Sequence, residues 1–575
     1  MRRTDGTFAK LRAGLGLLLW LGAAAPLSLS SCDTPAEDMQ PESPDPVVPL
    51  LPDEWPLHVE QRCPGDKACA DSGDGVLFAG VGKVDVTPQV EPFEDKNGNN
   101  LRDDDEPFTD LDGNGKFDAY WMAGYGNARL ALKVHDKVWA RAIVLRQNQT
   151  TVALVAMDAL GLFLEETAEV EKILRAKLGA AYDIDLLLVH ATHVHQNADT
   201  VGGWGPNFTT SGIHPGYQQR WRQAIADAVL QARGDLRPAR LSVSSIAVED
   251  PGHDMRRYVG DSRDPVVIDN TLHTLQFLEA GDAQPPKPIA TLVNWAHHPE
   301  SAGSENHEIT SDFVHFLREE MEAKGTGTVV YVSGALGGQI GPGKVVPIDE
   351  MGNPVPKHSF KKAELIGKGV ATFALSAMAD PKAKTVEGKD AKLRLRTAVF
   401  PAQIANLTYH FANMLGIYKR TTCCYDMNRP IDDSNLPSAE TRVAYLSLGP
   451  LSIITNPGEL LPELFLGGYD GSHAGTYPFI DMNKANAPDV SKAPQPPYLI
   501  DLMDGDRQHR MTFGLTMDFL GYIVPRYNWV LDEKNPYFEE AKGDHYEETN
   551  SIGPLAEPQI VGTMRQLILS SKPKK

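Results

Sequence analysis

The chain has 575 residues, of which 42% are hydrophobic and 23% charged, and its formal net charge at pH 7 is −21. A chain of this length forms one large domain with insertions or several ordinary domains, and its hydrophobic content is enough to bury a sizeable core. The strong negative charge argues against nucleic-acid binding, because recognition of phosphates requires clustered Lys and Arg.

The first 32 residues have the pattern of an export signal. Four basic residues among the first twelve precede the apolar stretch "AGLGLLLWLGAAA", which is too short to span a bilayer comfortably. The segment ends in "LSLSSC", whose last residue is Cys32. This ending is similar to a bacterial lipobox, in which the cysteine is lipidated and becomes the mature N-terminus. We therefore expect an exported lipoprotein, anchored to a membrane in the periplasm or at the cell surface; an ordinary cleaved signal peptide is the alternative.

Residues 33–76 are expected to form an acidic, proline-rich tether before a catalytic domain at residues 77–575. The stretch "DTPAEDMQPESPDPVVPLLPDEWP" lacks core-forming periodicity, as flexible linkers do. The two cysteines of "CPGDKAC" are spaced for a small disulfide loop, which an oxidising compartment allows. For the adjacent Cys423 and Cys424, a strained mutual bridge, pairing elsewhere and free thiols all remain open.

From residue 77 onward, aliphatic or β-branched runs alternate with amphipathic helical stretches. Five runs are typical of buried strands that lead into polar or glycine-rich turns, at residues 152–162, 185–193, 288–299, 327–338 and 446–459. Helical patterns lie between them, at 165–180 and 311–325. This alternation favours a single large α/β domain with mixed sheets flanked by helices, rather than a sandwich or a bundle. In such folds ligands collect at the carboxyl ends of strands.

A small insertion at residues 93–121 contains two oxygen-rich loops with the spacing of calcium-binding loops. The first is "DKNGNNLRDDDE", in which Asn100 replaces the usual glycine at the sharp turn, and asparagine tolerates the left-handed backbone found there. The second is "DLDGNGKFDAYW", in which Trp121 replaces the usual closing acid. The expected ligands of a structural Ca²⁺ are Asp95, Asn97, Asn99, Asp103, Glu106, Asp110, Asp112, Asn114 and Asp118. Solvated acidic loops without an ion are the alternative.

Histidines and an acid follow three of the predicted strands. His193 and His195 form an H-x-H pair, and two such side chains point the same way if the backbone is extended. His297 and His298 follow a second strand, and Glu459 follows a third after a Pro-Gly turn. A hydrolytic zinc needs three or four nitrogen or oxygen ligands from separate elements, with one position open for water. The three clusters therefore predict a zinc site at the strand ends.

The sequence resembles the neutral/alkaline non-lysosomal ceramidase family over most of residues 78–560. Six segments follow the order of the family's motifs. They are "GVGKVDVTP", "MAGYGNARLALKVHDKVWARAIVL", "HATHVHQNADTVGG", "NWAHHPES" with the following "NHEITSD", "NPGELLPE", and "MDFLGYIVP" with "DHYEETNSIGP". No segment is decisive alone, but six in the family's order are a specific signal.

The resemblance implies a site and a reaction. The implied zinc ligands are His193, His298, Glu459 and Tyr522. His195 and Tyr546 are implied to lie beside the metal, and Arg257 falls where the family has a substrate-contacting arginine, with the adjacent Arg256 as a rival. In the family mechanism, zinc-bound water attacks an amide carbonyl while nearby His and Tyr groups stabilise the oxyanion and protonate the leaving amine.

Several of these residues also have a purely structural interpretation. The alternative interpretation of Tyr522 is a packed aromatic residue, and that of Glu459 is an acid in the first turn of a helix. Asp312 has the position of a helix N-cap. His190 and His307 are expected to be hydrogen-bonded bystanders outside the site.

The sequence also departs from the family's motifs. Gln196 and Asn197 replace small residues after the H-x-H pair, so we expect the rim of the pocket to differ in shape and polarity. The segment "GALGGQIGP" at 334–342 lacks the serine sometimes proposed as a nucleophile, which favours attack by metal-bound water.

We therefore predict a membrane-tethered, zinc-dependent amidohydrolase that cleaves the N-acyl amide bond of ceramide or a related N-acylated lipid. This is the reaction of an N-acylsphingosine amidohydrolase in sphingolipid metabolism. One alternative keeps the zinc but changes the substrate to another amide, a peptide or an ester. Another is a non-catalytic, calcium-binding surface lipoprotein.

Overall fold

The computed structural model describes residues 57–570 except 248–257, 282, 284, 342–347, 350 and 472–479. The predicted export signal with Cys32, the first part of the tether, and Arg256 and Arg257 lie outside the described residues. Of the helices in the described part, none combines the length and the apolar character needed to cross a membrane.

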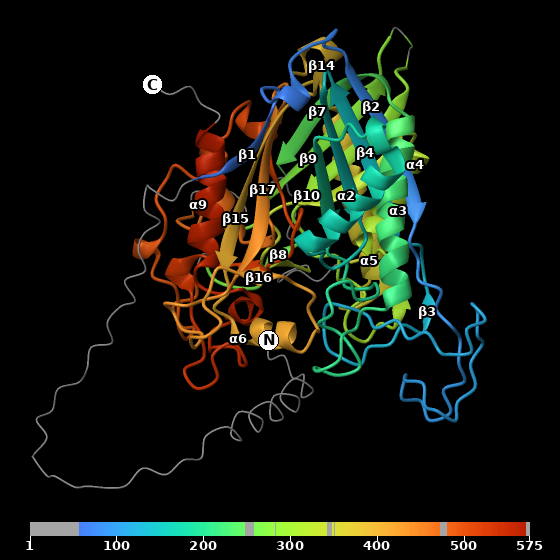
Figure 1. Cartoon of the computed structure of the whole chain (residues 1–575), viewed down its shortest axis with the longest axis vertical. Coiled ribbons are helices and arrows are strands. Elements are labelled where there is room, and N and C mark those ends of the chain that lie inside the picture. Colours follow the sequence, from blue (N-terminus) through green and yellow to red (C-terminus); the bar gives the residue numbers. More distant parts are fainter. Residues whose placement is uncertain are drawn as a thin grey trace, which may run out of the picture. The chain divides into compact units, whose positions relative to one another are not determined.

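The larger of two main sheets has nine strands in the order β12-β10-β9-β7-β2-β4-β5-β6, with β14 paired to β7 (Figure 1). These strands are β2 Leu77–Asp85, β4 Trp139–Gln147, β5 Thr150–Met157, β6 Leu186–Ala191, β7 Arg237–Ala247, β9 Thr271–Glu279, β10 Pro288–Trp295, β12 Thr328–Ser333 and β14 Lys384–Val386. The pairs β5–β6 and β10–β12 are parallel and the others antiparallel, so the sheet is mixed, as predicted.

The smaller sheet has six strands in the order β1-β15-β17-β18-β20, with β16 paired to β17. They are β1 Val59–Cys63, β15 Arg394–Gln403, β16 Thr422–Cys423, β17 Ser438–Leu448, β18 Leu451–Thr455 and β20 Arg510–Phe513. The single strand predicted at 446–459 is wrong. A turn at Gly449, whose φ of 62° suits glycine, separates the end of β17 from β18.

Folded structure begins before residue 77, where the catalytic domain was expected to start. β1 lies within the predicted tether and pairs with β15. The predicted disulfide between Cys63 and Cys69 is present, with an S–S distance of 2.04 Å. Cys423 and Cys424 are joined to each other, which was one of the open alternatives.

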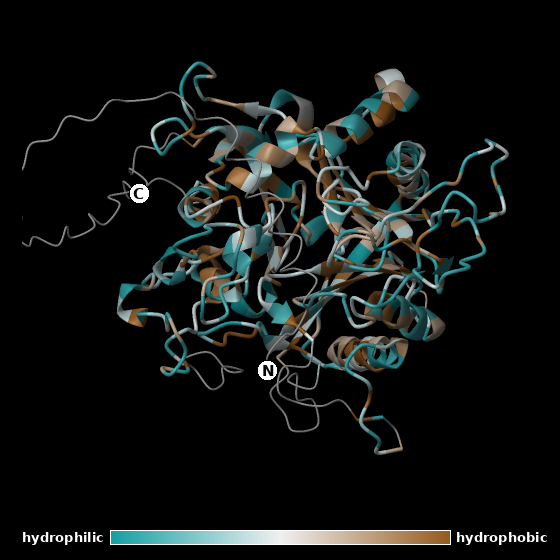
Figure 2. Ribbon diagram, turned by 90° about the horizontal axis from the view of Figure 1, so that it is seen from below, coloured by the Kyte–Doolittle hydropathy of each residue, from teal (hydrophilic) through white to brown (hydrophobic). Residues whose placement is uncertain are grey.

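The two main sheets face each other and helices cover their outer faces. The shared core includes Leu154 and Phe277 from the larger sheet and Leu446 and Phe513 from the smaller. Helices α2 Leu164–Leu178, α3 Pro215–Gly234, α4 Phe313–Ala323 and α5 Phe360–Ala379 pack on the larger sheet, and α9 Ala556–Leu569 packs on the smaller. In Figure 2 the helices carry both hydrophilic and hydrophobic residues, as expected for amphipathic helices packed on a sheet.

Short elements fill the loops at the carboxyl ends of the strands. Three ladders of two residues pair β11 Glu308–Ile309 with β3 Lys133–Val134, β13 Gln339–Ile340 with β8 Gly260–Asp261, and β19 Glu459–Leu460 with β21 Tyr522–Ile523. The remaining short helices are α6 Leu407–Met414, α7 Pro462–Leu466, α8 Leu499–Leu502, and the 3-10 helices at Lys67–Cys69, Gly179–Ala181, Gly388–Asp390, Val490–Lys492, Arg507–His509, Arg526–Asn528 and Glu547–Asn550.

The regular elements follow from local sequence. Every residue of β5 is buried, because the strand is covered on both faces, and its sequence TTVALVAM is accordingly apolar or β-branched. Asp312 precedes α4 and its carboxylate accepts a hydrogen bond from Phe313 N. The interpretation of Asp312 as a helix N-cap is therefore confirmed.

Asp158, the residue after β5, ties several of these elements together. It is fully buried, and its carboxylate accepts hydrogen bonds from both terminal nitrogens of Arg318 on α4, at 2.7 and 2.9 Å. It also accepts from Trp139 N at 2.8 Å and from Ser311 Oγ at 2.9 Å. Burial alone raises the pKa of Asp158, but Arg318 outweighs burial and the pKa lies below its ordinary value.

The same residue holds the loop that follows β6. Thr192 Oγ1 donates to the Asp158 carboxylate at 3.2 Å, and Asn197 Nδ2 donates to the Asp158 carbonyl oxygen at 2.6 Å. These residues flank the H-x-H pair. Asp158 therefore links the loop that carries both histidines to α4.

Replacing Arg318 by Met should lower the free energy of unfolding at pH 7 by roughly 3–5 kcal/mol, because it leaves the buried Asp158 carboxylate without its counter-ion. Denaturant titration measures this loss. A folded-state pKa below the unfolded value contributes stability that is present above the unfolded pKa and lost as pH falls. The difference in the free energy of unfolding between wild type and R318M should therefore become smaller at acidic pH.

Lys172→Met is the matched control, because Lys172 is exposed and pairs with Glu169 on the surface of α2. It should change the free energy of unfolding by less than about 0.5 kcal/mol. Equal losses in the two variants would show that Arg318 is no more than a surface charge.

Candidate metal centre

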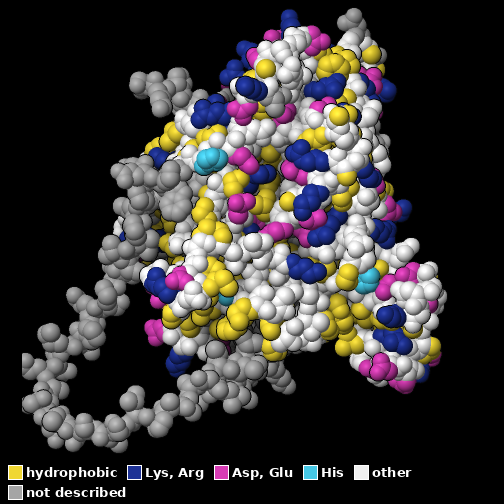
Figure 3. All heavy atoms as spheres, viewed as in Figure 1, with side chains coloured by type: hydrophobic (Ala, Val, Ile, Leu, Met, Phe, Trp, Pro, Cys, Tyr) yellow, Lys and Arg dark blue, Asp and Glu magenta, His cyan; other side chains and the backbone are white. Residues whose placement is uncertain are grey.

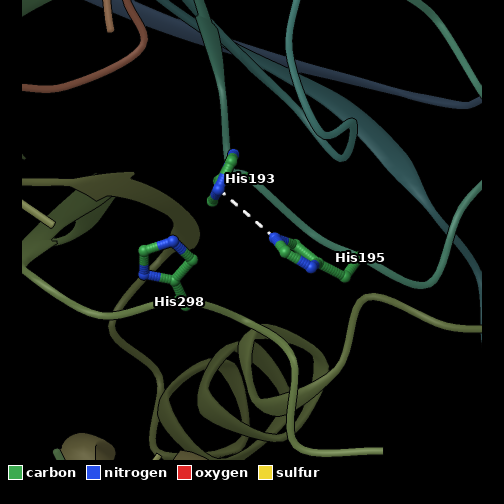
Figure 4. Close-up of side chains that lie close together, drawn as sticks. All are labelled: His193, His195 and His298. Carbon is green, nitrogen blue, oxygen red and sulfur yellow. Dashed lines mark hydrogen bonds between the residues drawn. The ribbon is translucent and has the colours of Figure 1, made fainter. Parts of the chain in front are cut away.

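Three histidines lie together at the carboxyl ends of strands in the larger sheet (Figure 4). His193, His195 and His298 are all buried, and one ring nitrogen from each lies within 4.8 Å of the others. His193 Nε2 and His195 Nε2 are 3.3 Å apart. In the figure the three rings point toward one another from two separate segments of chain.

The backbone at His193 is strained. Its φ of 67° lies in the left-handed region, which residues other than glycine rarely adopt. The peptide is held there by a hydrogen bond of 2.9 Å from His193 N to Ala159 O. The histidines therefore do not share an extended backbone, and the turn at His193 brings its ring toward His298. Strain of this kind concentrates at functional sites.

Glu459 and Tyr522 join the histidines from the smaller sheet's side. The ladder β19–β21 places Glu459 in register with Tyr522. Glu459 Oε2 lies 3.3 Å from His193 Nε2 and 3.1 Å from His298 Nε2. The Tyr522 hydroxyl lies 3.4 Å from His298 Nε2. All four residues predicted as zinc ligands therefore meet at one point, although they come from different segments of the chain.

Hydrogen bonds to backbone carbonyls orient two of the three imidazoles. His193 Nδ1 donates to Leu160 O at 2.7 Å, and His298 Nδ1 donates to Gln339 O at 3.0 Å. A carbonyl oxygen only accepts, so Nδ1 carries the hydrogen and Nε2 is the nitrogen available to a metal. Both Nε2 atoms face Glu459.

His195 has a different environment. Its Nδ1 has no hydrogen-bond partner among the described residues, and the Glu300 carboxylate lies 3.8 Å away, beyond hydrogen-bond distance. Burial, together with His193 and His298, holds the pKa of His195 well below its usual value. His193 and His298 are therefore oriented by backbone carbonyls, as metal-binding histidines usually are, whereas His195 has no such partner.

The carboxylate at the centre is held in its charged form. Burial alone raises the pKa of Glu459, but the two neighbouring imidazoles, first His193 and then His298, outweigh burial and bring the pKa below its ordinary value. An ionised carboxylate between two imidazole nitrogens is a donor set typical of zinc.

The segment "MAGYGN", residues 122–127, packs against His195. A Cβ at Gly124 would lie 2.5 Å from His195 Cγ, so only glycine fits there. The ring of Tyr125 meets the ring of His195 edge to face, with centroids 5.2 Å apart. Arg129 donates a hydrogen bond to the carbonyl oxygen of His195. Sequence reasoning recognised this segment only as a motif and did not place its residues at the site.

Tyr546 lies next to Tyr522 in the structure. Its ring meets that of Tyr522 edge to face, with centroids 5.7 Å apart. It is 37% exposed, so Tyr546 stands on the solvent side of the buried cluster. Arg257, the predicted substrate-contacting residue, lies outside the described residues.

The histidines left out of the site are hydrogen-bonded elsewhere, as expected. His190 Nδ1 donates to Gly514 O at 2.8 Å, and its Nε2 accepts from Ser333 N at 3.2 Å. His307 Nδ1 donates to Leu130 O at 2.7 Å.

The structure places Gln196 and Asn197 inside the protein, and the predicted difference at the rim of the pocket stays a prediction. Both side chains are buried and hydrogen-bonded within the loops. Gln196 Nε2 donates to Gly303 O at 3.1 Å, and Asn197 Nδ2 is bound to Asp158 as described above. Polarity alone did not reveal that these amides bind other groups of the protein.

The two oxygen-rich loops adopt similar conformations. In the first, Asp95 accepts hydrogen bonds from the backbone of Gly98 and Asn100. In the second, Asp110 accepts from the backbone of Gly113 and Gly115. The two backbone donors occupy the same positions in the first loop as in the second.

An acid outside the predicted insertion completes the second loop. In the first loop, Glu106 accepts from the backbone N–H groups of positions two and nine, Lys96 at 2.7 Å and Asp103 at 2.9 Å. In the second, Glu91 accepts from the same two positions, Leu111 and Asp118, each at 2.8 Å. Glu91 is buried and replaces the acid missing at Trp121. Sequence reasoning missed it because it precedes both loops.

The buried cluster of His193, His195 and His298 could hold a metal ion, and it lies in an α/β fold. Residues 109–381 match the family model described as neutral/alkaline non-lysosomal ceramidase, N-terminal. The resemblance recognised in the sequence is thereby confirmed, and this part of the chain carries the sequence pattern of that family. A comparison with curated proteins finds no match.

Two solved structures share the fold. The first is described as "Crystal Structure Analysis of neutral ceramidase from Pseudomonas aeruginosa"; it is 14% identical, with a TM-score of 0.59, and the alignment covers 88% of this chain and 76% of that one. The second, "Ceramidase complexed with C2", is also 14% identical, with a TM-score of 0.56 and coverages of 86% and 75%. Identity this low supports the fold alone.

Replacing Gly124 by Ala should lower the free energy of unfolding by about 1–3 kcal/mol, because the added Cβ overlaps the His195 ring. The φ of 103° at Gly124 also disfavours alanine. Gly126→Ala is the matched control, since a Cβ there meets nothing within 4 Å. Denaturant titration compares the two variants, and equal effects would contradict the close packing of Gly124 on His195.

Proposed function

We propose that the chain is a zinc-dependent amidohydrolase that cleaves the N-acyl amide bond of ceramide or a related N-acylated lipid. The observation that carries the proposal is the convergence of His193 Nε2 and His298 Nε2 on the Glu459 carboxylate, with each Nδ1 bound to a carbonyl. The match of residues 109–381 to the ceramidase family model supports the substrate class.

The residues present fit zinc. Two imidazoles, a carboxylate and the phenol of Tyr522 give nitrogen and oxygen donors of the kind that zinc prefers. Carbonyl partners behind the ligating histidines fix their tautomers, a regular feature of zinc sites. Among the described residues, His193, His195 and His298 also form a possible three-histidine set, but His195 lacks such a carbonyl partner.

The surrounding groups suit amide hydrolysis. Zinc, when bound, polarises the scissile carbonyl and lowers the pKa of a coordinated water. His195 Nε2 faces the cluster and is placed to take a proton, while its Nδ1 faces Glu300, whose carboxylate favours the protonated ring. Tyr546, on the solvent side, is placed to donate a hydrogen bond to the developing oxyanion, and His195 to return the proton to the leaving amine.

Ceramide hydrolysis by purified protein tests the proposal. The wild-type chain should contain about one zinc and release fatty acid from ceramide, and chelation should abolish the release until zinc is restored. His193→Ala and His298→Ala should lose both zinc and activity, because each removes an oriented ligand. His58→Ala, a change at an exposed histidine, is the control and should keep both.

Three outcomes would change the proposal. His195→Ala should keep zinc and lose turnover, so loss of zinc in this variant would support the three-histidine set instead. If zinc-loaded wild-type protein leaves ceramide intact but cleaves small acyl-amino substrates, the substrate is another amide. Absence of zinc from the wild type would favour the non-catalytic alternative.

We also propose that the two oxygen-rich loops bind structural Ca²⁺, one ion each. The second loop takes its closing acid from Glu91, which occupies the place that Glu106 has in the first. Glu91, Asp110 and Asp112 bring carboxylate oxygens within 4.8 Å of one another, a separation that one ion bridges.

Glu91→Gln should reduce bound calcium from about two ions per chain to about one, since a bidentate acid closes each loop of this type. Elemental analysis after dialysis measures the ratio. Glu106→Gln should have the same effect through the first loop, and Glu94→Gln, at an exposed neighbour of Glu91, should have none. Wild-type protein without calcium would refute the proposal.

Export and membrane anchoring through Cys32 remain predictions from the sequence. A lipid attached to Cys32 in the mature protein, sought by mass spectrometry, would support them, and an unmodified N-terminus would refute them.

A further inference from the structure

A segment of the chain, residues 404–437, connects β15 to β17 of the smaller sheet and includes the short strand β16. We call this segment the cap. Its base is closed by a hydrogen bond of 2.8 Å from Ile404 N to Pro437 O. The cap contains α6, β16 and a long loop, and α6 lies at the lower end of the sheets in Figure 1.

One side of the cap contacts the elements that carry the two tyrosines of the site. A Cβ at Gly521, the residue before Tyr522, would lie 2.9 Å from the hydroxyl of Tyr409 on α6. Asn406 Nδ2 donates to Thr549 O at 3.2 Å, and Thr549 belongs to the 3-10 helix that follows Tyr546. The cap therefore adjoins the solvent side of the centre.

The other side of the cap contacts the loop that follows His195. A Cβ at Gly202 would lie 2.0 Å from Ile417 O, and a Cβ at Gly203 would lie 3.3 Å from the Tyr418 hydroxyl. The cap thus touches segments on both sides of the metal centre.

The outer surface of the cap is unusually apolar. Of the twelve large hydrophobic side chains that are exposed in the described residues, five lie in the cap, which marks it as an interaction surface. They are Leu407, Met414, Leu415, Met427 and Ile431. Two of them, Met414 and Met427, are 79% and 82% exposed. Hydrophobic side chains gather over the lower part of the face seen in Figure 3, where α6 lies in Figure 1.

The charges of the cap indicate what kind of surface it contacts. Its three basic residues are Lys419, Arg420 and Arg429, and its three acidic residues are Asp426, Asp432 and Asp433. The cap therefore has no net charge, in a chain of net charge −21. Attraction to an anionic membrane requires an excess of Lys and Arg, which the cap lacks.

We propose that the cap docks the protein onto a neutral or zwitterionic lipid surface, so that an N-acylated lipid passes from the bilayer to the metal centre behind it. The inference rests on the proposed function for the identity of the lipid that enters. The docking itself rests on the apolar outer surface, its charge balance and its continuity with both sides of the centre.

Hydrogen–deuterium exchange of the full-length chain tests whether the cap itself contacts the lipid surface. Addition of phosphatidylcholine vesicles should slow exchange in peptides from residues 404–437, because lipid covers their backbone. Peptides that contain Met351 or Leu569, which are exposed hydrophobic residues outside the cap, should exchange as before. This local measurement is insensitive to vesicle binding by the N-terminal apolar segment, and it needs no catalytic activity.

A triple variant, Met414→Gln, Leu415→Gln and Met427→Gln, tests the consequence for substrate entry. The ratio of ceramide hydrolysis in vesicles to hydrolysis of a water-soluble short-chain analogue should fall at least about tenfold, the order expected when a single apolar side chain no longer enters the lipid. The matched control is Met351→Gln, Met482→Gln and Leu569→Gln, which changes equally exposed types of residue outside the cap and should keep the wild-type ratio.

Three results would overturn the proposal. The first is unchanged exchange in the cap on addition of vesicles. The second is protection that appears only with phosphatidylserine, which would mean that attraction to an anionic lipid drives the docking. The third is protection that rises with protein concentration in the absence of lipid, which would mean that a second copy of the chain covers this surface. If vesicles protect the cap but ceramide is never cleaved, the docking stands and the proposed function fails.

Discussion

The geometry of the site depends on the buried ion pair between Asp158 and Arg318. Asp158 directly follows β5, the strand next to the edge strand β6 in the larger sheet, and its oxygens are bound by the neighbouring strand β4, by α4 and by the loop that carries the H-x-H pair. A buried charge of this kind is tolerated only when every oxygen is bound, so the elements around it have little freedom to shift. The strained backbone of His193 lies within this rigid frame, which is the condition under which such strain persists.

The smaller sheet contributes to the site by a different route. The ladder between β19 and β21 has only two residues on each strand, yet it aligns Glu459 with Tyr522. The histidines come from loops of the larger sheet, so the centre lies where the ends of the two sheets meet. A metal held there would connect the two layers as well as support chemistry, because its ligands belong to both.

Much of this arrangement was predictable from sequence, because strand ends and their polar residues form local patterns. The runs at 152–162, 185–193, 288–299 and 327–338 correspond to β5, β6, β10 and β12, and the candidate ligands follow such runs. The choice among the histidines came from the family resemblance, and the carbonyl partners of His193 and His298 give it a physical basis. The turn that splits β17 from β18 was missed, because a continuous apolar run hides a tight turn at Gly449.

Other features required the folded structure because their causes are distant in sequence. Gly124 is needed where it is only because the ring of His195 lies against it, and Glu300 faces His195 across a gap of more than a hundred residues. Gln196 and Asn197 seemed suited to a pocket rim, but their hydrogen bonds to Gly303 and Asp158 place them inside the loops. Residue type did not distinguish these environments.

The closing acid at Glu91 makes the two oxygen-rich loops unequal as modules. Residues 95–106 carry the carboxylates, those of Asp95 and Glu106, that bind this loop's own backbone. Residues 110–121 lack one of theirs, since the acceptor of the Leu111 and Asp118 N–H groups is Glu91. The second loop therefore depends on the chain that precedes the first, and a fragment that begins at Asp95 would leave these two N–H groups without their acceptor.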